Sequence, residues 1–558
     1  MNISRNVALA GLVGLCGALP AAAQSLEELR NDGKNPDNVL TYGMGYSQQR
    51  FSPLAKIDKN NVKRLVPVWS VGLENEFGEQ AQPLIYNGVM YVSNAKWTVA
   101  IDALTGRQLW RTAVEFVPET PRVVCCGVSN KGVALFNGKV FRTTLDAYVV
   151  ALDQKTGKEL WKSKVMDWKD GYSMTAAPVV ANGVLITGIS GAEFGIRGFI
   201  DGWDPETGKQ LWRRHTTAAP GESGGNSWPD DKAYLNGGGS TWITGSYDPD
   251  LDLLYWGVGN AGPWNANYRR GDNLYTASVI AVRPKTGEIV WHYQFTPNEA
   301  YDYDAVSELI LGELKVAGQP RKVVMQLNRN GFVYVLDRAN GKLLAANPYG
   351  KVNWATHVDM ATGRPVESDV AKRIRAGEEV ELWPSIVGVK NWQHAAFNPN
   401  TGLMYTNTLH MFSKFKLTPI DPPKPGARYI GAQFTVVAAT NEPKGFIEAI
   451  DPMTGKAKWK LPLNDHANWS AMLATGSGLL FTGRHSGEFQ ALDADTGKTL
   501  WEFQTSSGVT SMPVTWTHQG KQYVTVLSGL GGLGVRFARD ALKNVPLGGS
   551  VWTFALPQ

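Results

Sequence analysis

Oxygen-bearing side chains that could hold a metal ion occur at three separate places in the sequence. Tyr301-Asp302-Tyr303-Asp304 has two carboxylates at positions i and i+2, which point to the same side if the segment is extended. Glu193 follows Ser190-Gly191-Ala192, and Asn260 follows Gly257-Val258-Gly259. Carboxylate and amide oxygens without histidine or cysteine ligands suit a hard cation. Each residue alone is more typical of a turn, but the set indicates a candidate cation site.

Two adjacent cysteines, Cys125 and Cys126, are the second unusual feature. The third cysteine, Cys16, lies in the N-terminal apolar segment. If Cys125 and Cys126 are oxidised, they form a strained eight-membered ring, and such strain is found mainly where the surroundings enforce it, commonly at functional sites. A bridge between neighbours closes no chain loop and cannot stabilise the fold as a long-range disulfide does. Two buried thiols are the alternative interpretation.

Several familiar catalytic motifs are excluded by their context. Gly529-Leu-Gly531-Gly-Leu-Gly534 matches the dinucleotide-binding pattern, but the 24 residues that follow are too few for a βαβ unit. Gly221-Glu-Ser223-Gly-Gly225 matches the nucleophile elbow without its strand-to-helix context. The sequence contains no His-x-x-x-His or Cys-x-x-Cys pair, so zinc and covalently attached haem are not expected.

A repeated turn motif organises the chain that must position these residues. The pattern Asp-x-x-Thr-Gly-x-x-x-Trp begins at Asp102, Asp153, Asp204, Asp451 and Asp493, and the first three are 51 residues apart. A variant ends at Trp291, and a degenerate copy begins at Asp337. An apolar run precedes each motif, and the glycine suits a corner with positive φ. The motif therefore predicts a strand, a turn, and a returning strand that starts at the tryptophan.

These repeats predict an all-β fold, an eight-bladed β-propeller with tryptophan-docking repeats. Strand-rich units that cannot bury their own faces must stack on one another. Dividing residues 24–558 by eight gives about 67 residues, enough for a four-stranded blade with its loops. The repeated tryptophans are expected to pack between blades. Helical periodicity is best at residues 369–379. The proline-rich segment 415–433 is expected to be a long surface loop; a simple insertion is the preferred interpretation, and a cap over the entrance or a contact with a partner is the alternative.

Residues 1–23 have the features of a signal peptide. Arg5 precedes an apolar run over residues 7–19, and Ala21-Ala22-Ala23 supplies the small-residue end. Residues 24–558 are then a single propeller domain with a net charge of +4, since Arg5 is removed from a chain of charge +5. So small a charge does not favour nucleic-acid binding, and no later apolar run could span a bilayer. The sequence predicts a periplasmic protein, and a homodimer is compatible with it.

Seven motifs together resemble the pyrroloquinoline quinone (PQQ)-dependent alcohol dehydrogenases of the methanol/ethanol type, which are eight-bladed propellers. They occur in the family's order and cover essentially the whole mature chain. The motifs are Cys125-Cys126 followed by Asn130-Lys131-Gly132, Ser190-Gly-Ala-Glu193, Gly239-Ser-Thr-Trp242, Gly257-Val-Gly-Asn260, Tyr301-Asp-Tyr-Asp304, Arg329-Asn-Gly331 and Lys390-Asn391-Trp392.

The resemblance implies a quinone between the indole of Trp242 and the ring of Cys125 and Cys126. The other implied cofactor contacts are Glu79, Lys131, Thr143 or Thr144, Ser190, Gly191, Ala192, Ser240, Arg329, Asn391, Trp469 and Gly532. The implied metal site consists of Glu193, Asn260, Asp302 and Asp304. Asp302 would also be the general base, and Arg329 would stabilise the charge that develops on oxygen.

Asp304 favours a lanthanide over calcium. In the family that the chain resembles, calcium enzymes typically carry Ala or Ser at this position, whereas lanthanide enzymes carry Asp. Three acids beside a quinone carboxylate are better neutralised by a trivalent ion, and calcium is the alternative. The resemblance implies oxidation of a small alcohol to the aldehyde by metal-assisted hydride transfer to the quinone. A separate soluble cytochrome c would accept the electrons, because the chain lacks Cys-x-x-Cys-His.

Two positions depart from the family pattern, and two other interpretations stay open. Lys131 stands where Arg is usual, and Leu533 stands where methanol dehydrogenases tend to have Trp, which favours a substrate larger than methanol. One alternative is a calcium-dependent quinoprotein that acts on a secondary, cyclic or polymeric alcohol. The other is a non-catalytic periplasmic propeller scaffold, which would need only the tryptophan repeat.

Overall fold

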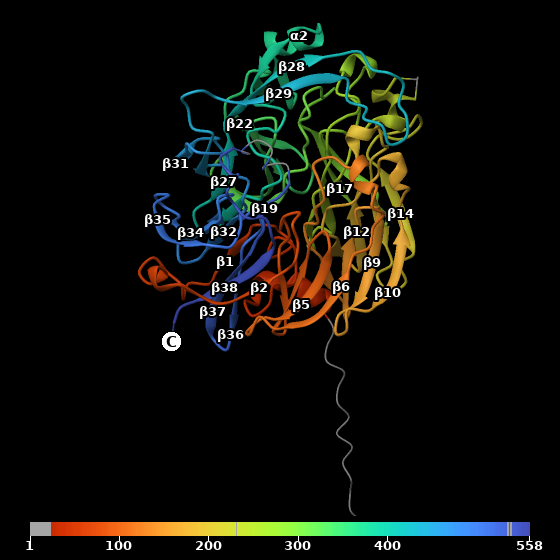
Figure 1. The fold of residues 1–558 in the computed structure, drawn as a ribbon. Coiled ribbons are helices and arrows are strands. Elements are labelled where there is room, and N and C mark those ends of the chain that lie inside the picture. The colour runs from red at the N-terminus through yellow and green to blue at the C-terminus, as the bar shows by residue number, and fades with distance from the viewer. Residues whose placement is uncertain (1–23, 230–231, 533–534, 536–537, 539, 558) are drawn as a thin grey trace, which may run out of the picture.

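The computed structural model describes residues 24–229, 232–532, 535, 538 and 540–557. The expected signal peptide and Leu533 lie outside these residues, so the structure does not bear on those two predictions. The described chain consists mainly of antiparallel sheets that follow one another along the sequence (Figure 1). The predicted all-β class is therefore correct.

The first four sheets each contain four consecutive strands, paired in order. They are β3 (Leu84–Tyr86), β4 (Val89–Ser93), β5 (Trp97–Asp102) and β6 (Gln108–Ala113); β7 (Ala134–Phe136), β8 (Lys139–Thr143), β9 (Tyr148–Asp153) and β10 (Glu159–Lys164); β11 (Val179–Ala181), β12 (Val184–Gly188), β13 (Phe199–Trp203) and β14 (Gln210–His215); and β15 (Ser246–Asp248), β16 (Leu253–Gly257), β17 (Ser278–Val282) and β18 (Ile289–Gln294).

Four further sheets complete the series. They are β19 (Ile310–Val316), β20 (Gln319–Leu327), β21 (Phe332–Asp337) and β22 (Leu343–Pro348); β26 (Ala396–Asn398), β27 (Leu403–Leu409), β30 (Gly445–Ile450) and β31 (Ala457–Leu463); β32 (Met472–Thr475), β33 (Leu479–Gly483), β34 (Glu488–Asp493) and β35 (Thr499–Gln504), with the short β1 (Phe51–Ser52) parallel to β32; and β36 (Val514–His518), β37 (Lys521–Ser528), β38 (Ser550–Ala555) and β2 (Val66–Gly72).

The last of these sheets joins the two ends of the described chain. Strand β2 pairs antiparallel with β38, so that Val71 lies opposite Val551. Figure 1 shows this as red and blue strands side by side. A sheet built from both chain ends closes the series, because it removes the edges that the first and last sheets would otherwise present.

The repeated tryptophans Trp110 and Trp161 pack against the neighbouring sheet, as the sequence predicts, and each docks onto the glycine of the next repeat. Gly157 has φ of 71°, and a Cβ on it would lie 2.5 Å from the ring of Trp110. The indole Nε1 of Trp110 donates to the carbonyl of Gln154 at 3.0 Å. The same contact joins Trp161 to Gly208. Each glycine thus supplies both a positive φ and room for the indole.

Two details of the repeat differ from the prediction. Trp110 is the third residue of β6, so the returning strand begins two residues earlier than expected. Trp69 on β2 also docks, with Nε1 donating to the Ala103 carbonyl at 3.0 Å and its ring against Gly106. No Asp-x-x-Thr-Gly turn precedes Trp69, and its strand enters the sheet from the other end of the chain, so the repeated motif does not reveal it.

The smaller elements lie outside the repeating sheets. They are α1 (Leu26–Arg30), β23 (Ala355–Asp359), β24 (Arg364–Glu367), α2 (Asp369–Arg375), β25 (Val380–Leu382), β28 (Met411–Leu417) and β29 (Ala432–Ala438). The predicted helix exists but ends at Arg375 rather than at residue 379. The predicted loop 415–433 was too long, because buried Phe415 and Leu417 alternate with exposed lysines and form a strand of a hairpin. Neither described α-helix has the length needed to cross a bilayer.

Candidate active site

The candidate site residues lie in connections at one end of the sheets. Consecutive strands of an antiparallel sheet alternate in direction, so the connection between the second and third strands emerges at the same end as the connection that leaves the fourth. Glu193, Asn260 and Arg329 lie in connections of the first kind, after β12, β16 and β20. Cys125 and Asp302 lie in connections of the second kind, after β6 and β18. Residues distant in sequence therefore meet at one face.

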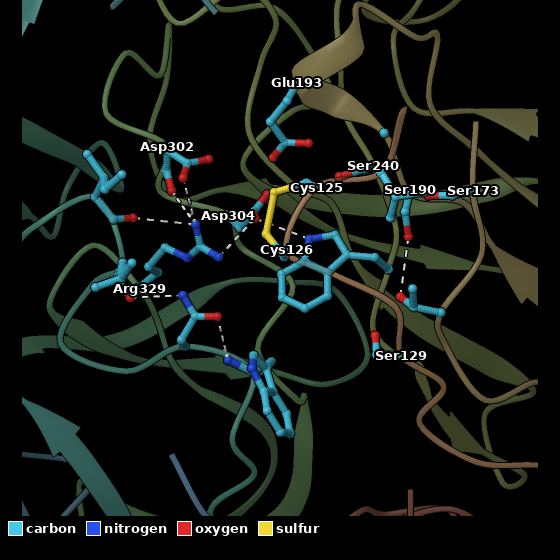
Figure 2. A pocket seen from close by; sticks show the side chains of 18 of the residues that line it. Cys125, Cys126, Ser129, Ser173, Ser190, Glu193, Ser240, Asp302, Asp304 and Arg329 are labelled. Carbon is cyan, nitrogen blue, oxygen red and sulfur yellow. Dashed lines mark hydrogen bonds and ion pairs between the residues drawn. A yellow bond between two sulfur atoms is a disulfide. The ribbon is translucent and has the colours of Figure 1, made fainter. Parts of the chain in front are cut away.

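A cavity of about 400 Å³ opens among these connections. This volume is within the range of small-molecule sites, roughly 300–1,000 Å³. The predicted site residues that line it are Cys125, Cys126, Lys131, Ser190, Gly191, Glu193, Ser240, Trp242, Asp302, Asp304, Arg329 and Asn391 (Figure 2).

Arg329 lies between two carboxylates at the centre of the cavity wall. Its Nη1 lies 3.2 Å from Asp302 Oδ2, and its Nη2 lies 3.0 Å from Asp304 Oδ2 (Figure 2). Asp304 also accepts hydrogen bonds from Trp242 Nε1 at 3.1 Å and from the backbone N–H of Asn260 at 2.7 Å. All three charged side chains are at most 12% exposed. Charged hydrogen bonds of this kind hold the groups in a defined geometry.

The backbone of Asp302 corrects one prediction. Its φ is +65°, a left-handed conformation, so residues 301–304 are not extended. The two acids face the same guanidinium because the chain turns at Asp302, not because side chains alternate along a strand. Burial raises the pKa of Asp302 well above its ordinary value, and the acids Asp304 and Glu193 act in the same direction, against Arg329. A higher pKa makes this carboxylate a better proton acceptor near neutral pH.

Two buried oxygens near these acids have no hydrogen-bond partner among the residues that the structure describes. They are Oδ1 of Asn260, which is fully buried, and Oδ1 of Asp302. Unpaired buried acceptors are uncommon; a hard cation would satisfy Asn260 Oδ1, and a proton donor would satisfy Asp302 Oδ1. Glu193 lies in the 3₁₀ turn η5 (Ala192–Phe194), and burial followed by the charge of Asp304 raises its pKa. Within the described ranges, however, no three His, Cys, Asp or Glu side chains are grouped as a metal site.

The cysteines and a lysine form another part of the cavity. Cys125 and Cys126 are joined by a disulfide, so the alternative of two free thiols is wrong. The ammonium of Lys131 lies 5.4 Å from the ring centroid of Trp242 and 5.5 Å from that of Trp392. Burial lowers the pKa of Lys131 to about 7. Among the described residues its ammonium has no ion pair, so a carboxylate of a bound molecule would complete its surroundings.

Other predicted cofactor contacts do not line the cavity. The Glu79 carboxylate is buried and accepts hydrogen bonds from Asn75 and Asn94, and burial raises its pKa to about 8. The hydroxyls of Thr143 and Thr144 donate to the Ala176 carbonyl and to Asp146. The remaining contacts outside the lining are Ala192, Trp469 and Gly532; Ala192 and Trp469 are buried, and a Cβ on Gly532 would lie 2.4 Å from Gln80, which lines the cavity.

Several lining residues were missed from the sequence. Trp392 ends the motif Lys390-Asn391-Trp392, and Trp264 lies four residues after the motif Gly257-Val-Gly-Asn260, but neither was predicted to be part of the wall. Arg428 and Ile430 lie in the proline-rich segment 415–433 and Phe434 follows it directly; all three lie in the cavity wall. Their only sequence signal was that segment's proline-rich composition. The other missed residues are Gln80, Val124, Ser129, Ser173, Thr175, Ile386 and Val387.

Comparison with known proteins identifies relatives over nearly the whole chain. A family model described as "Glucose/ethanol/alcohol dehydrogenase, beta-propeller domain", under the name PQQ, matches residues 40–352 and 461–524. Quinoprotein alcohol dehydrogenase PedH of Pseudomonas putida is 42% identical, and the match covers 98% of this chain and 95% of that protein. A quinoprotein ethanol dehydrogenase of Pseudomonas putida is 38% identical, over 99% of this chain and 96% of the relative.

Solved structures give the same result. A europium-containing methanol dehydrogenase superposes with a TM-score of 0.90 at 34% identity, covering 95% of this chain and all of that one. A quinohemoprotein alcohol dehydrogenase from Comamonas testosteroni superposes with a TM-score of 0.87 at 33% identity, covering 95% of this chain and 82% of that one. The rest of the Comamonas testosteroni protein has no superposed counterpart in this chain.

Proposed function

Since the chain belongs to the PQQ β-propeller dehydrogenase family and is a quinoprotein alcohol dehydrogenase, we propose that it oxidises an alcohol to the aldehyde with Asp302 as the general base and a lanthanide ion in the cavity. The observation that carries this proposal is the placement of Arg329 between Asp302 and Asp304. The same cavity is lined by the disulfide and by Trp242, where a flat cofactor would stack.

The cavity residues fit a flat quinone that carries several carboxylates. Lys131 supplies a buried cation without an ion-pair partner in the described part of the chain, held beside two indoles. The side-chain amide of Asn391 and the hydroxyls of Ser190 and Ser240 supply further polar contacts. When bound, the quinone supplies the acceptor for the two electrons of alcohol oxidation.

Asp302 would take the proton of the alcohol hydroxyl. Its Oδ1 is free of hydrogen bonds, whereas its Oδ2 is held by Arg329. A base with one oxygen fixed and the other available needs little reorganisation when the proton is transferred. Arg329 also donates to the Asp302 carbonyl at 2.6 Å, so it orients both the backbone and the side chain of the base.

The metal proposal rests on charge. Glu193, Asp302 and Asp304 supply up to three negative charges, while Arg329 neutralises one of them. Around a divalent ion the remaining repulsion would be larger than around a trivalent ion. The unpaired oxygen of Asn260 supports its assignment as a neutral ligand. The bound ion would supply Lewis acidity at the quinone carbonyl.

We also propose that the β-propeller has eight blades, that the protein is periplasmic and that it passes electrons to a cytochrome c. Seven four-stranded sheets and one five-stranded sheet among the described residues support eight blades. The signal-like residues 1–23 support export. The names of the quinohaemoprotein relatives support a haem-type acceptor, which this chain would have to find in a separate protein.

Reconstitution tests the function directly. The purified chain should be incubated with PQQ and either calcium or lanthanum, and alcohol-dependent reduction of an artificial dye should be measured. We expect turnover that requires the quinone and is highest with lanthanum. If the quinone binds, as judged by its absorption, but no primary alcohol reduces the dye with either ion, the proposed reaction is wrong. Full activity with calcium and no gain from lanthanum would overturn the metal assignment alone.

A further inference from the structure

The turn that presents Asp302 is held by a buried carboxylate that lies outside the cavity. Oε1 of Glu299 accepts the backbone N–H groups of Tyr301 at 2.5 Å and Tyr303 at 2.8 Å. These two amides flank Asp302, whose φ is +65°. Successive N–H groups around a left-handed residue form a concave donor pair that fits one anionic oxygen. Because Glu299 fills this concavity, it stabilises the backbone conformation that a non-glycine residue would otherwise avoid.

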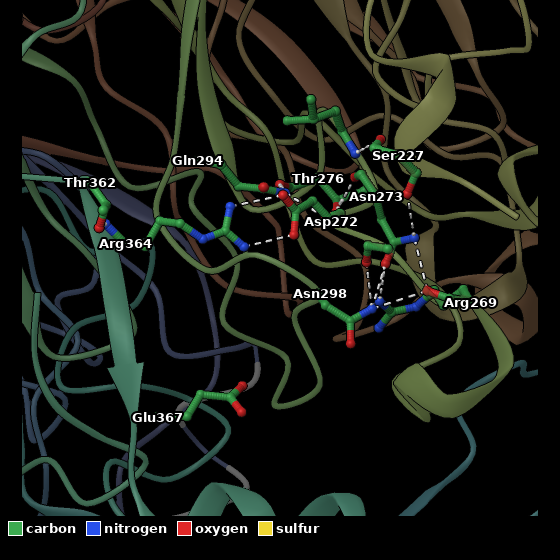
Figure 3. A network of polar contacts seen from close by, with 12 residues as sticks. Ser227, Arg269, Asp272, Asn273, Thr276, Gln294, Asn298, Thr362, Arg364 and Glu367 are labelled. Carbon is green, nitrogen blue, oxygen red and sulfur yellow. Dashed lines mark hydrogen bonds and ion pairs between the residues drawn. The ribbon is translucent and has the colours of Figure 1, made fainter. Parts of the chain in front are cut away.

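Glu299 is itself fixed by a network of polar contacts. Arg269 is fully buried and donates to the Glu299 carbonyl, to the Pro263 carbonyl at 2.8 Å and to Asn273 Oδ1 at 2.8 Å. The amide of the preceding residue, Asn298, donates to the Arg269 carbonyl and to Asn273 Oδ1, both at 3.0 Å (Figure 3). The backbone at Glu299 is therefore held in place, so its carboxylate can fix the position of residues 301–303.

The network extends to the helix outside the repeating sheets. Arg375, the last residue of α2, donates to Asn298 Oδ1 at 2.7 Å and forms an ion pair with Glu367 at 2.5 Å. Glu367 is the last residue of β24, beside α2 in the sequence. Arg375, itself held by Glu367, thus supports through Asn298 the segment that leads to the turn at Asp302.

Two residues, Arg329 and Glu299, hold the turn at Asp302. On the cavity side, Arg329 bonds both the carbonyl and the carboxylate of Asp302. Glu299, which is not among the residues that line the cavity, accepts hydrogen bonds from the amides before and after Asp302. Both Arg329 and Glu299 therefore hold Asp302 in its conformation. Loss of the Glu299 acceptor would leave two buried N–H groups unpaired, which favours a different backbone conformation.

We propose that Glu299 is a positioning residue: its carboxylate holds the turn at Asp302 so that the Asp302 side chain points at Arg329 and into the cavity. This inference rests on the proposed function, in which Asp302 is the general base. Only an acceptor oxygen is needed, so an amide in place of the carboxylate retains the effect.

The test compares Glu299→Ala with Glu299→Gln in the full-length protein. Hydrogen–deuterium exchange of peptides covering residues 299–305 should show faster exchange of the Tyr301 and Tyr303 amides in Glu299→Ala, and near-wild-type exchange in Glu299→Gln. In the PQQ-loaded enzyme, kcat of Glu299→Ala should fall roughly 10–100-fold, the effect of misplacing a reacting group by about 1 Å. KM and quinone affinity should change less than about threefold, because Glu299 contacts neither alcohol nor cofactor.

Glu448→Ala is the matched control. Glu448 is also a buried carboxylate, paired with Thr408 and Lys460 in another sheet. This variant should lower thermal stability without altering kcat or exchange at residues 299–305.

Unchanged exchange in Glu299→Ala, or equal losses of kcat in the Ala and Gln variants, would refute the positioning role. If wild-type protein shows no alcohol oxidation, the proposed function fails, whereas the exchange result still decides whether Glu299 holds the turn.

Discussion

Replacing Lys131 with methionine should make the quinone-free protein more stable at acidic pH and weaken quinone binding. Lys131 is 4% exposed, and burial lowers the pKa of its ammonium from 10.5 to about 7. Since each pKa unit corresponds to about 1.4 kcal/mol, burial disfavours the charged form by up to about 5 kcal/mol. Methionine has a similar length and no charge, so Lys131→Met removes this cost.

The pH dependence has a definite sign. Between pH 7 and 10.5 the unfolded chain keeps a proton on Lys131 that the folded, quinone-free protein has lost. The free energy of unfolding therefore rises with pH across this window, and the burial cost is present in full only below pH 7. The stability advantage of Lys131→Met should be largest near pH 6 and should shrink towards pH 10.

Quinone binding to the wild-type protein should be favoured at low pH, whereas the stability of the quinone-free protein is favoured at high pH. A carboxylate beside Lys131 favours the ammonium, so above pH 7 the wild-type protein must take up a proton when it binds the quinone. Affinity should then fall as pH rises. In Lys131→Met the affinity should be lower by about 2–5 kcal/mol, the cost of truncating one partner of a buried charge pair, and should lose this pH dependence. Lys131→Arg stays charged and should also lack the slope.

Urea denaturation between pH 6 and 10 and fluorescence titration with PQQ measure these effects. The indoles of Trp242 and Trp392 near Lys131 provide the signal. If Lys131→Met is less stable than wild type at pH 6, or if wild-type affinity does not change between pH 6 and 9, then the ammonium is not an unpaired buried charge and the reasoning is wrong.

Three further predictions concern the acids and the buried ion pair. Asp302→Asn should lower kcat about 10²–10⁴-fold with quinone still bound, because the base is removed; a near-wild-type rate would exclude that role. Asp304→Ala should shift the preferred ion from lanthanum towards calcium, since one negative charge is lost; activation by the two ions is the measurement, and an unchanged preference would contradict the charge argument. Lys390→Met should lower the free energy of unfolding, measured in urea, by about 3–5 kcal/mol. The ammonium of Lys390 lies 2.8 Å from the Glu308 carboxylate, which the substitution would leave unpaired in the core. A stabilised variant would show that the pair is not needed.

The fold could be predicted from the sequence wherever local chemistry determines it. The glycine in each turn motif must accept both a positive φ and a neighbouring indole, as at Gly157, so the repeat marks the sheets. Trp69 could not be found in this way, since its partner strand β38 comes from the other chain end. Contacts that depend on two distant segments leave no pattern in either one.

The site could be predicted only as far as its motifs extended. Cys125, Glu193 and Asp304 line one cavity because antiparallel strands bring alternate connections to one face. The conformation of Asp302 could not be inferred, since an acid at i and i+2 is compatible with a strand or a turn. Phe434 also lies in the cavity wall, but no sequence motif marks it, because its strand β29 belongs to a hairpin outside the repeat.

The supports of the turn at Asp302 explain why the tryptophan repeat alone does not make an enzyme. Docked indoles fix the sheets, but the connections between sheets are long enough to adopt several conformations. Here Glu299 and Arg329 both hold one connection, and Arg375, at the end of a helix that the repeat does not contain, donates to Asn298, the residue before Glu299. A scaffold would gain nothing from such buried, charged contacts, which cost desolvation energy. Their presence around one carboxylate fits the proposed role of Asp302 as the base.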